Sequence, residues 1–252
     1  MRRIELTALV AGVALLVVPQ GARAESDDAA RSAQTLATPK AVVELFTSKG
    51  CSSCPAADAV IGRVVAKRHD VVALTLSTDI WDYLGWKDTL SSPRFGERHK
   101  AYAKAFKDML YTPQAVINGA VHINGADEAL LNRKIDNLPG PRVPIRVWEE
   151  AGKLHIEAAG SENASGKSAT LWLAVVADQV TVPIKRGENG GKTLTYYNVV
   201  REITPVGMWT GKTMSVQFER ASITRPDTNR CAVLLQEGQG GPIIGAAMLD
   251  KF

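Results

Sequence analysis

The sequence has little of what marks several common protein classes. Only 3 of its 252 residues are cysteine and 6% are aromatic, while basic and acidic residues number 30 and 26. Three cysteines are too few for a disulfide scaffold, and the near balance of charge gives no reason to expect nucleic acid or an acidic membrane as a partner. An apolar fraction of 45% with 22% charged residues excludes a disordered chain and predicts one or two domains with their own cores.

The first 24 residues have the pattern of a secretory signal peptide. Two arginines precede an uncharged, mostly apolar run over residues 7–18, and Ala-Arg-Ala at 22–24 is a small-x-small cleavage site. The run is shorter than the ~20 residues of a membrane helix, and no second run approaches that length. We therefore expect cleavage after Ala24, a flexible leader over 25–39, and a secreted or periplasmic mature chain without a membrane span. An uncleaved anchor is the alternative.

Residues 40–139 alternate strand and helix patterns. Apolar runs predict strands at 41–46 and 71–76, and the stretch between them repeats apolar residues at helical spacing up to about residue 68. Asn118-Gly119 is a two-residue hairpin signal. The remaining patterns predict a helix over 93–109, strands over 114–117 and 121–123, and a helix over 126–138.

The segment Cys51-Ser52-Ser53-Cys54 stands where the first strand gives way to the first helix. Free N–H groups at a helix N-terminus favour a thiolate, and Lys49 adds a positive charge nearby. Cys51 is therefore the expected nucleophile and Cys54 the more buried, resolving thiol. Two other interpretations stay open, an inert structural disulfide and a soft-metal site for an ion such as Cu(I).

No resident cofactor is expected. Pro55 stands where haem attachment needs a histidine directly after the second cysteine. The four histidines show no ligand spacing, so a structural zinc site with its four ligands is not predicted.

Residues 40–139 resemble the thioredoxin fold, through the C-x-x-C at the start of the first helix, Thr112-Pro113 before the third strand, and the hairpin and helix that follow. Gly50 and the Ser-Ser pair depart from thioredoxin itself, so the direction of any redox reaction stays open. Nearly the whole mature chain is also similar to DUF1223, a family of secreted bacterial proteins of unknown function. That similarity is carried by ELFTSKGCSSCPAAD (44–58), DIWDYLGWKDTLSSPRF (79–95), YTPQAVING (111–119) and RGENGGKTLTYYNVV (186–200).

The resemblance to thioredoxin implies roles for residues outside the cysteine pair. It implies that Pro113 is cis and faces the cysteines, and that the backbone of Thr112 pairs with an extended substrate chain. Trp81 and Trp86, with Tyr83 between them, would wall the same region as substrate-binding residues. The alternative is that these aromatic residues belong to the core.

Pro139-Gly140-Pro141 marks a predicted domain boundary. Beyond it, short alternating strands about ten residues apart predict an antiparallel sandwich. The expected fold is an α/β thioredoxin-like domain over 40–139 followed by an all-β sandwich-like domain over 140–252. The expected strands of the second domain are 143–148, 154–158, 169–176, 194–202, 214–218, 232–236 and 243–248.

Two further features of the second half need an interpretation. The run GENGGKT (187–193) resembles a phosphate loop but is one residue short and precedes a strand pattern, so nucleotide binding is rejected. It is a Gly-rich hairpin loop or, alternatively, a loop that faces the cysteine groove. Cys231 begins an apolar strand and is expected to be a small buried residue, with a redox partnership with Cys51 or Cys54 as the alternative.

The leading functional hypothesis is an extracytoplasmic thiol–disulfide oxidoreductase. It would act on a cysteine-containing protein substrate and need a redox partner that the sequence does not identify. Cys51, Cys54 and Pro113 are the predicted catalytic residues, and Thr112, Trp81 and Trp86 the predicted substrate-binding residues. The alternatives are a non-catalytic binding or scaffold protein with a static disulfide, and a Cu(I) carrier.

Overall fold

The first half of the chain forms strands and helices close to their predicted positions. The computed structural model describes residues 38–84, 87–161 and 168–251. Asn118 and Gly119 have φ values of 53° and 60°, the left-handed backbone of the expected two-residue turn. The elements are β1 (Ala41–Thr47), α2 (Cys54–Lys67), β2 (Val71–Ser77), the short 3-10 helix η1 (Asp82–Leu84), α3 (Pro93–Phe106), β3 (Gln114–Ile117), β4 (Val121–Asn124) and α4 (Glu128–Asn137).

The described part of the second half is built mainly from strands, most of them at predicted positions. β7 and β8 are much longer than expected, and they pair as one antiparallel hairpin from Ala169 opposite Trp209 to Pro183 opposite Thr193. The elements are β5 (Ile145–Glu150), β6 (Lys153–Ala158), β7 (Ala169–Pro183), β8 (Thr193–Trp209), β9 (Met214–Glu219), α5 (Arg220–Ile223), β10 (Arg230–Glu237) and β11 (Ile243–Asp250).

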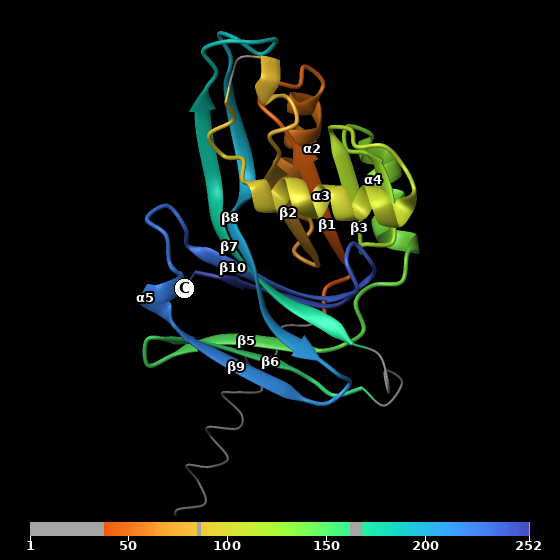
Figure 1. Cartoon of the computed structure of the whole chain (residues 1–252), viewed down its shortest axis with the longest axis vertical. Helices are drawn as coiled ribbons and strands as arrows, with labels where there is room; N and C mark the ends of the chain where they lie inside the picture. Colours follow the sequence, from red (N-terminus) through yellow and green to blue (C-terminus); the bar gives the residue numbers. More distant parts are fainter. Residues whose placement is uncertain (1–37, 85–86, 162–167, 252) are drawn as a thin grey trace, which may run out of the picture. The chain divides into compact units, whose positions relative to one another are not determined.

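The expected fold class, a thioredoxin-like α/β domain followed by an all-β sandwich, is wrong. Strands predominate, and a mixed eight-stranded sheet in the order β11-β10-β7-β8-β2-β1-β3-β4 contains strands of both halves (Figure 1). A second, three-stranded sheet has the order β5-β6-β9. The domain boundary at residues 139 and 140 stays a prediction, and in the structure it falls between α4 and β5.

The two halves meet where β2 pairs with β8 in parallel, with Thr75 opposite Val199. The Thr75 hydroxyl donates to the carbonyl oxygen of Tyr197 at 2.7 Å, and Nδ2 of Asn198 donates to that of Ala73 at 2.9 Å. Asn198 has a φ of 46°, a left-handed conformation that asparagine tolerates better than most residues. Side chains therefore supply part of the hydrogen bonding that joins the halves.

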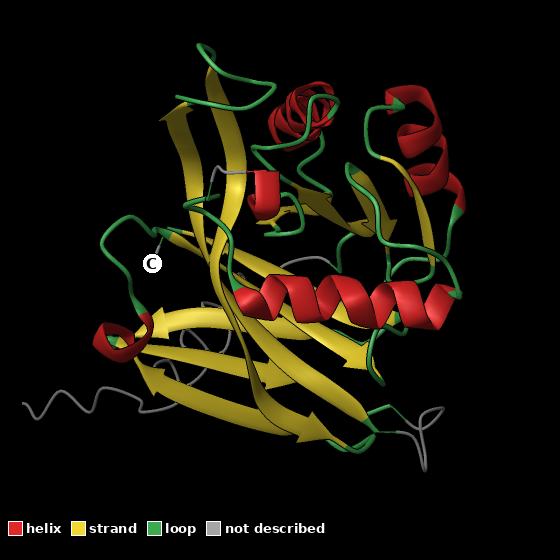
Figure 2. Ribbon diagram, turned by 45° about the horizontal axis from the view of Figure 1, so that its top comes forward, coloured by secondary structure: helices red, strands yellow, loops and turns green. Residues whose placement is uncertain are grey.

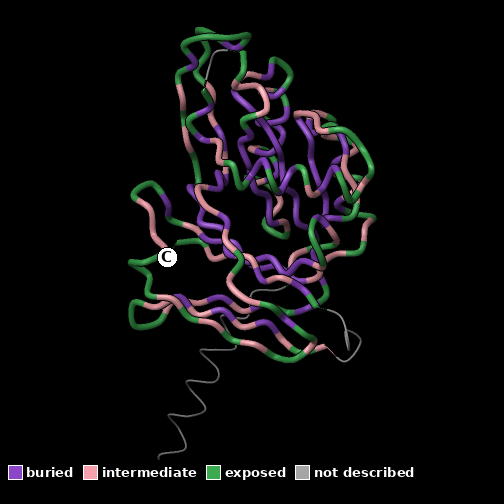
Figure 3. The backbone as a smooth tube through the Cα atoms, in the orientation of Figure 1, coloured by how far each residue is buried: buried purple, intermediate pink, exposed green. Residues whose placement is uncertain are grey.

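Helices cover both faces of the part of the sheet formed by β1 to β4. α2 and α4 pack on one face through residues such as Ile61 and Leu131, and α3 packs on the other through Phe95 (Figures 1 and 2). The β5-β6-β9 sheet packs against β7, β10 and β11 in a separate core that includes Leu154 and Val233. β1, β2 and β3 are buried along almost their whole length (Figure 3).

A buried ionic network joins α3 to strands of both halves. Glu44 on β1 accepts hydrogen bonds from Nε and Nη2 of Arg98 at 2.6 and 3.0 Å, and from the Tyr102 hydroxyl at 2.5 Å. Nη1 of Arg98 donates to Oε1 of Gln236 on β10 at 2.9 Å. The Arg98 charge is tolerated in the interior because it is paired and hydrogen-bonded. The same contacts hold α3 against β1 and β10.

The predicted signal peptide lies outside the described residues, as does the leader up to residue 37. Among the helices that the structure describes, none is long and apolar enough to cross a bilayer. Secretion therefore stays a prediction from residues 1–24.

Candidate functional site

Cys51 and Cys54 lie where β1 turns into α2. They form a disulfide, with their Cα atoms 5.4 Å apart. The Cys51 N–H donates to the Ser48 carbonyl at 3.2 Å, and the Cys54 N–H donates to the Cys51 carbonyl at 3.3 Å, so two tight turns shape the loop. Cys51 is 5% exposed and Cys54 is 0% exposed, which confirms that Cys54 is the more buried of the two.

The Cys51 sulfur faces two oxygen atoms. The Ser53 hydroxyl oxygen lies 3.4 Å from it, and the carbonyl oxygen of Thr112 lies 3.6 Å from it. The Thr112–Pro113 peptide bond is cis, as the resemblance implied, and Pro113 is buried. A Cys51 thiolate would accept a hydrogen bond from the Ser53 hydroxyl, whereas a Cys51 thiol could donate one to the Thr112 carbonyl oxygen. The structure therefore brings the predicted nucleophile together with Thr112.

Trp81 is a half-buried side chain beside the cysteine loop. Its Nε1–H donates to the Thr112 hydroxyl at 2.8 Å, so it helps to hold the segment that faces Cys51. A Cβ atom on Gly50 would lie 2.9 Å from the Cβ of Trp81, which explains why a residue without a side chain precedes Cys51. The Tyr83 ring lies 6.1 Å from that of Trp81 and is largely exposed. Trp86, the other tryptophan predicted to bind substrate, lies outside the described residues.

Lys49 does not supply the free positive charge that the sequence predicts beside Cys51. Its ammonium group lies 3.3 Å from Oδ1 of Asp88 and 2.6 Å from the Thr89 hydroxyl, and the Lys49 and Asp88 side chains are fully buried. Burial lowers the pKa of Lys49, and the Asp88 carboxylate opposes that shift. Asp88 also accepts the backbone N–H groups of Lys49 and Leu90. The pair therefore fixes the backbone of the loop.

The Gly-rich run lies at the end of the β7–β8 hairpin and docks on the cysteine loop; we call residues 184–192 the hairpin tip. Asn189 is fully buried, and its Nδ2 donates to the carbonyl oxygens of Lys49 at 3.0 Å and Cys51 at 2.8 Å. Oε2 of Glu188 accepts the Ser52 N–H at 3.1 Å. The interpretation that this loop faces the cysteine pair is confirmed, although the sequence did not single out Asn189 or Glu188.

Hydrogen bonds within the hairpin tip hold it in one conformation. Gly187 and Gly191 have φ values of 79° and 81°, which favour glycine. The Gly191 N–H donates to the Ile184 carbonyl at 2.8 Å, and Nζ of Lys192 donates to Oδ1 of Asn189 at 3.0 Å. The Gly-rich segment that resembles a phosphate loop therefore forms a tight turn, which directs the Asn189 side chain toward the cysteine loop.

Removing the Asn189 amide should loosen the hairpin tip. Asn189→Ala removes the amide that donates to two buried carbonyl groups, of which that of Cys51 keeps the Cys54 N–H, and such a loss typically costs about 1–3 kcal/mol of unfolding free energy. Urea unfolding of the oxidised protein measures this loss, and alkylation of reduced Cys51 by iodoacetamide should become severalfold faster. Asn132→Ala, which removes an amide bonded to one carbonyl within α4, is the matched control. Unchanged alkylation would show that the tip does not shield Cys51.

Asp58 is a buried acid one helical turn beyond Cys54. It is 4% exposed, and neither of its carboxyl oxygens has a hydrogen-bond partner of normal geometry. Burial raises its pKa to about 8; the nearby Thr47 hydroxyl lowers it, and the Asp88 charge raises it further. The hydroxyl of Tyr196 on β8 is also buried without a partner, and its pKa is raised by burial and by the charges of Asp58 and Asp88. Asp58 is therefore mainly a neutral acid at pH 7.

Comparison with known proteins identifies the family. The sequence profile of DUF1223, a protein family of unknown function, matches residues 42–236. The chain belongs to the DUF1223 family. The match includes the cysteine loop, Thr112-Pro113 and the hairpin tip, so the whole site lies inside the family region.

Two solved structures are similar to this DUF1223 chain. Protein AGR_C_4864 from Agrobacterium tumefaciens is 33% identical with a TM-score of 0.75, over 85% of this chain and 95% of that chain. HBP35 of Porphyromonas gingivalis is 14% identical with a TM-score of 0.59, over 85% of this chain and 76% of that chain, which shows a similar fold alone. None of the curated proteins matches. The comparisons confirm the resemblance to DUF1223 and assign no activity.

Cys231 is a buried core residue on β10, as the sequence predicts. It is 0% exposed and packs in the core between the two sheets. Burial raises the pKa of its thiol to about 12. Buried, protonated thiols react slowly, so these observations favour the core residue over the redox partner of Cys51 or Cys54.

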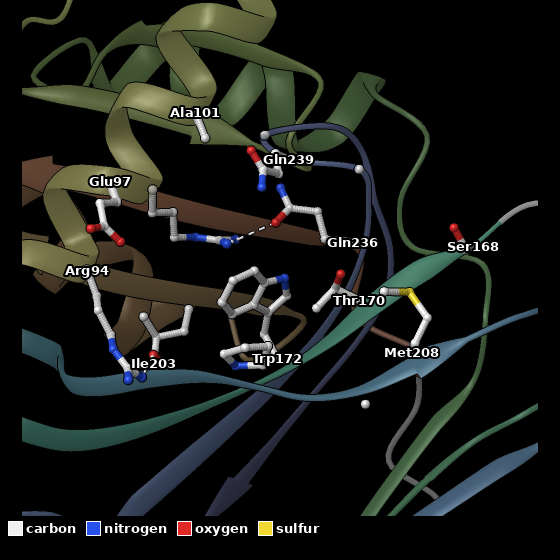
Figure 4. Close-up of a pocket in the computed structure, with 15 residues that line it drawn as sticks. Arg94, Glu97, Ala101, Ser168, Thr170, Trp172, Ile203, Met208, Gln236 and Gln239 are labelled. Carbon is white, nitrogen blue, oxygen red and sulfur yellow. Dashed lines mark hydrogen bonds between the residues drawn. The ribbon is translucent and has the colours of Figure 1, made fainter.

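A separate pocket contains none of the predicted site residues. It has a volume of about 990 Å³ between α3, the β7–β8 hairpin and the turn after β10, and its lining includes Arg94, Trp172 and Gln239 (Figure 4). The guanidinium of Arg98 lies 5.3 Å above the Trp172 ring and is paired with Glu44. Within the described ranges, no group of three His, Cys, Asp or Glu side chains is arranged to hold a metal ion. The cysteine loop is therefore the better supported candidate site.

Proposed function

We propose that this chain is an extracytoplasmic thiol–disulfide oxidoreductase that exchanges disulfides with cysteine-containing protein substrates. The proposal rests on the Cys51–Cys54 disulfide at the N-terminus of α2, with the Thr112 carbonyl oxygen 3.6 Å from the Cys51 sulfur. Amide groups at a helix N-terminus favour a thiolate, which is the nucleophile of disulfide exchange. The extracytoplasmic part of the proposal rests on the signal pattern of residues 1–24.

In the proposed reaction, the Cys51 thiolate attacks one sulfur of a substrate disulfide. The substrate S–S bond breaks, and its electron pair leaves on the second substrate sulfur. The Cys54 thiolate then attacks the Cys51 sulfur of the mixed disulfide, which forms the Cys51–Cys54 bond and releases the first substrate sulfur as a thiolate. One substrate disulfide is reduced and two protein thiols are oxidised. The same steps run backwards when the substrate is a dithiol, and a separate thiol or disulfide partner regenerates the pair.

The surface beside Cys51 supports a protein as the substrate. Tyr83 is 74% exposed and Leu84 is 52% exposed, and both belong to η1, which directly follows Trp81. Exposed apolar and aromatic side chains of this kind are common where proteins bind one another. We propose that this surface holds the substrate while the backbone of Thr112 pairs with an extended substrate segment, and Trp86 stays part of this proposed surface.

A static disulfide is the second candidate, and the burial of the cysteines favours it. The two residues are 5% and 0% exposed, and the hairpin tip is hydrogen-bonded to the loop that carries them. In that case the chain would be a binding or scaffold protein, and the disulfide would only add stability.

The reduction potential of the Cys51–Cys54 pair separates the two candidates. The mature protein is equilibrated in glutathione buffers, quenched with acid and freed of glutathione, and its thiols are counted by intact mass after alkylation in denaturant. Cys231 is free in both states, so the count should rise from one to three on reduction. A potential between about −120 and −270 mV supports the oxidoreductase, whereas one below about −300 mV with slow reaction favours the static disulfide.

A further inference from the structure

Glu188 of the hairpin tip accepts a hydrogen bond from a backbone N–H that could otherwise stabilise a Cys51 thiolate. Its Oε2 accepts the Ser52 N–H at 3.1 Å while the cysteines are joined as a disulfide. Ser52 follows Cys51 and directly precedes Ser53, the N-cap residue of α2, so its N–H lies in the loop just in front of the helix. An N–H group there can stabilise a thiolate on Cys51 together with the free amides of the helix end. In the reduced protein, two anions would therefore compete for one set of donors.

We propose that Glu188 is a positioning residue that destabilises the Cys51 thiolate and so makes the reduced pair a stronger reductant. The thiolate is present only in the reduced state, so a negative charge beside it raises the free energy of that state alone. The disulfide, which carries no charge, is unaffected. The biological meaning of this effect rests on the proposed function, but the effect itself is a property of the thiol.

The hairpin tip keeps Glu188 near Cys51. The next residue, Asn189, is fully buried and bonded to the carbonyl oxygens on both sides of Gly50. The Glu188 carboxylate therefore stays close to the amides of the cysteine loop as long as the tip is docked.

The charged groups around Cys51 compensate this repulsion only in part. Lys49 in the cysteine loop is paired with Asp88, whereas Lys192 in the tip keeps its positive charge because Oδ1 of Asn189 is neutral. Lys185 and Arg186 of the tip are exposed, so solvent and salt screen their charges. Asp58 lies one turn behind Cys54 on α2 and is a neutral acid at pH 7. The segment before β3 presents an uncharged carbonyl, that of Thr112.

The expected effect is moderate because the contact with Ser52 is exposed. Two unit charges about 5 Å apart in water change an equilibrium about fourfold, and the change is larger where the site is partly shielded from water. We therefore expect that Glu188→Gln raises the ratio of thiolate to thiol at Cys51 about three- to tenfold in dilute buffer. The glutamine oxygen can still accept the Ser52 N–H, so the tip should stay docked.

The test is a titration of reduced Cys51 in a Cys54→Ser background, followed by the ultraviolet absorbance of the thiolate. Glu188→Gln should move the titration to lower pH in dilute buffer, and the difference should nearly vanish in molar salt because salt screens exposed charges. With both cysteines present, and at a pH above the Cys51 titration of both proteins, the potential in glutathione buffers should become less negative, by about 30 mV for a tenfold change. In that reaction two glutathione thiols reduce the disulfide and become glutathione disulfide.

Glu150→Gln is the matched control, since it removes the same charge from an exposed position on β5. It should leave the titration unchanged. An unchanged titration in Glu188→Gln would overturn the proposal, and so would a difference that persists in molar salt, because that would mark a structural effect. The titration needs no substrate. A shift in Glu188→Gln together with a potential below about −300 mV would leave this inference standing while the proposed oxidoreductase fails.

Discussion

Replacing Cys51 with serine should lower the rate of disulfide exchange at least about a thousandfold, because a serine hydroxyl is not ionised at neutral pH and cannot attack a disulfide. Cys54→Ser should behave differently. It keeps the Cys51 thiolate, so the first attack still occurs, but no thiol remains to release the substrate. We expect a covalent one-to-one adduct to accumulate with a disulfide-bonded test protein, seen by non-reducing electrophoresis and intact mass and lost on addition of dithiothreitol.

The comparison between these two variants separates chemistry from stability. Both lose the same disulfide, which closes a very short loop and contributes about 2 kcal/mol in the chain-entropy description. Their urea unfolding curves should therefore be alike, while their reactions with the test protein differ. Equal behaviour in both assays, with no adduct in Cys54→Ser, would contradict an exchange mechanism and favour the static disulfide.

The features that the sequence predicts well are local ones. The helix after the cysteine pair follows from the three- and four-residue spacing of Ala57, Val60, Ile61 and Val64, all of which are buried in α2. The turn between β3 and β4 follows from Asn118-Gly119, because few residue pairs tolerate two successive positive φ angles. The placement of Cys51 and Cys54 at the start of α2 depends on the same local signals.

The features that the sequence does not predict depend on contacts between distant segments. No spacing or composition indicates that Thr75 lies opposite Val199, yet that pairing joins the halves into one sheet and overturns the expected fold class. Lys49 is another case, because the residue that neutralises it, Asp88, comes from a loop after β2. The role of Asn189 also depends on the length of β7 and β8, which continue beyond residues 176 and 202, where the expected strands end.

Replacing Asp58 with asparagine should make the protein more stable at alkaline pH. The folded protein holds the Asp58 proton up to a pKa of about 8, whereas an unfolded chain releases it near the ordinary value of 3.8. Its contribution to stability is therefore fully present below pH 4 and is lost progressively up to pH 8. Each pH unit in that window removes about 1.4 kcal/mol of unfolding free energy, so the loss between pH 5 and pH 8.5 is about 4 kcal/mol.

The measurement is the difference in unfolding free energy between Asp58→Asn and the wild type at several pH values, obtained from urea unfolding without reductant. An amide of nearly the same shape stays neutral throughout, and other titrating groups cancel in the difference. The advantage of the variant should rise from pH 5 and level off above pH 8. Asp178→Asn, at an exposed position, should give a flat difference within about 0.5 kcal/mol. A flat difference for Asp58→Asn would mean that the carboxyl already ionises below pH 5 in the folded protein, and that the interior behind Cys54 stabilises a charge.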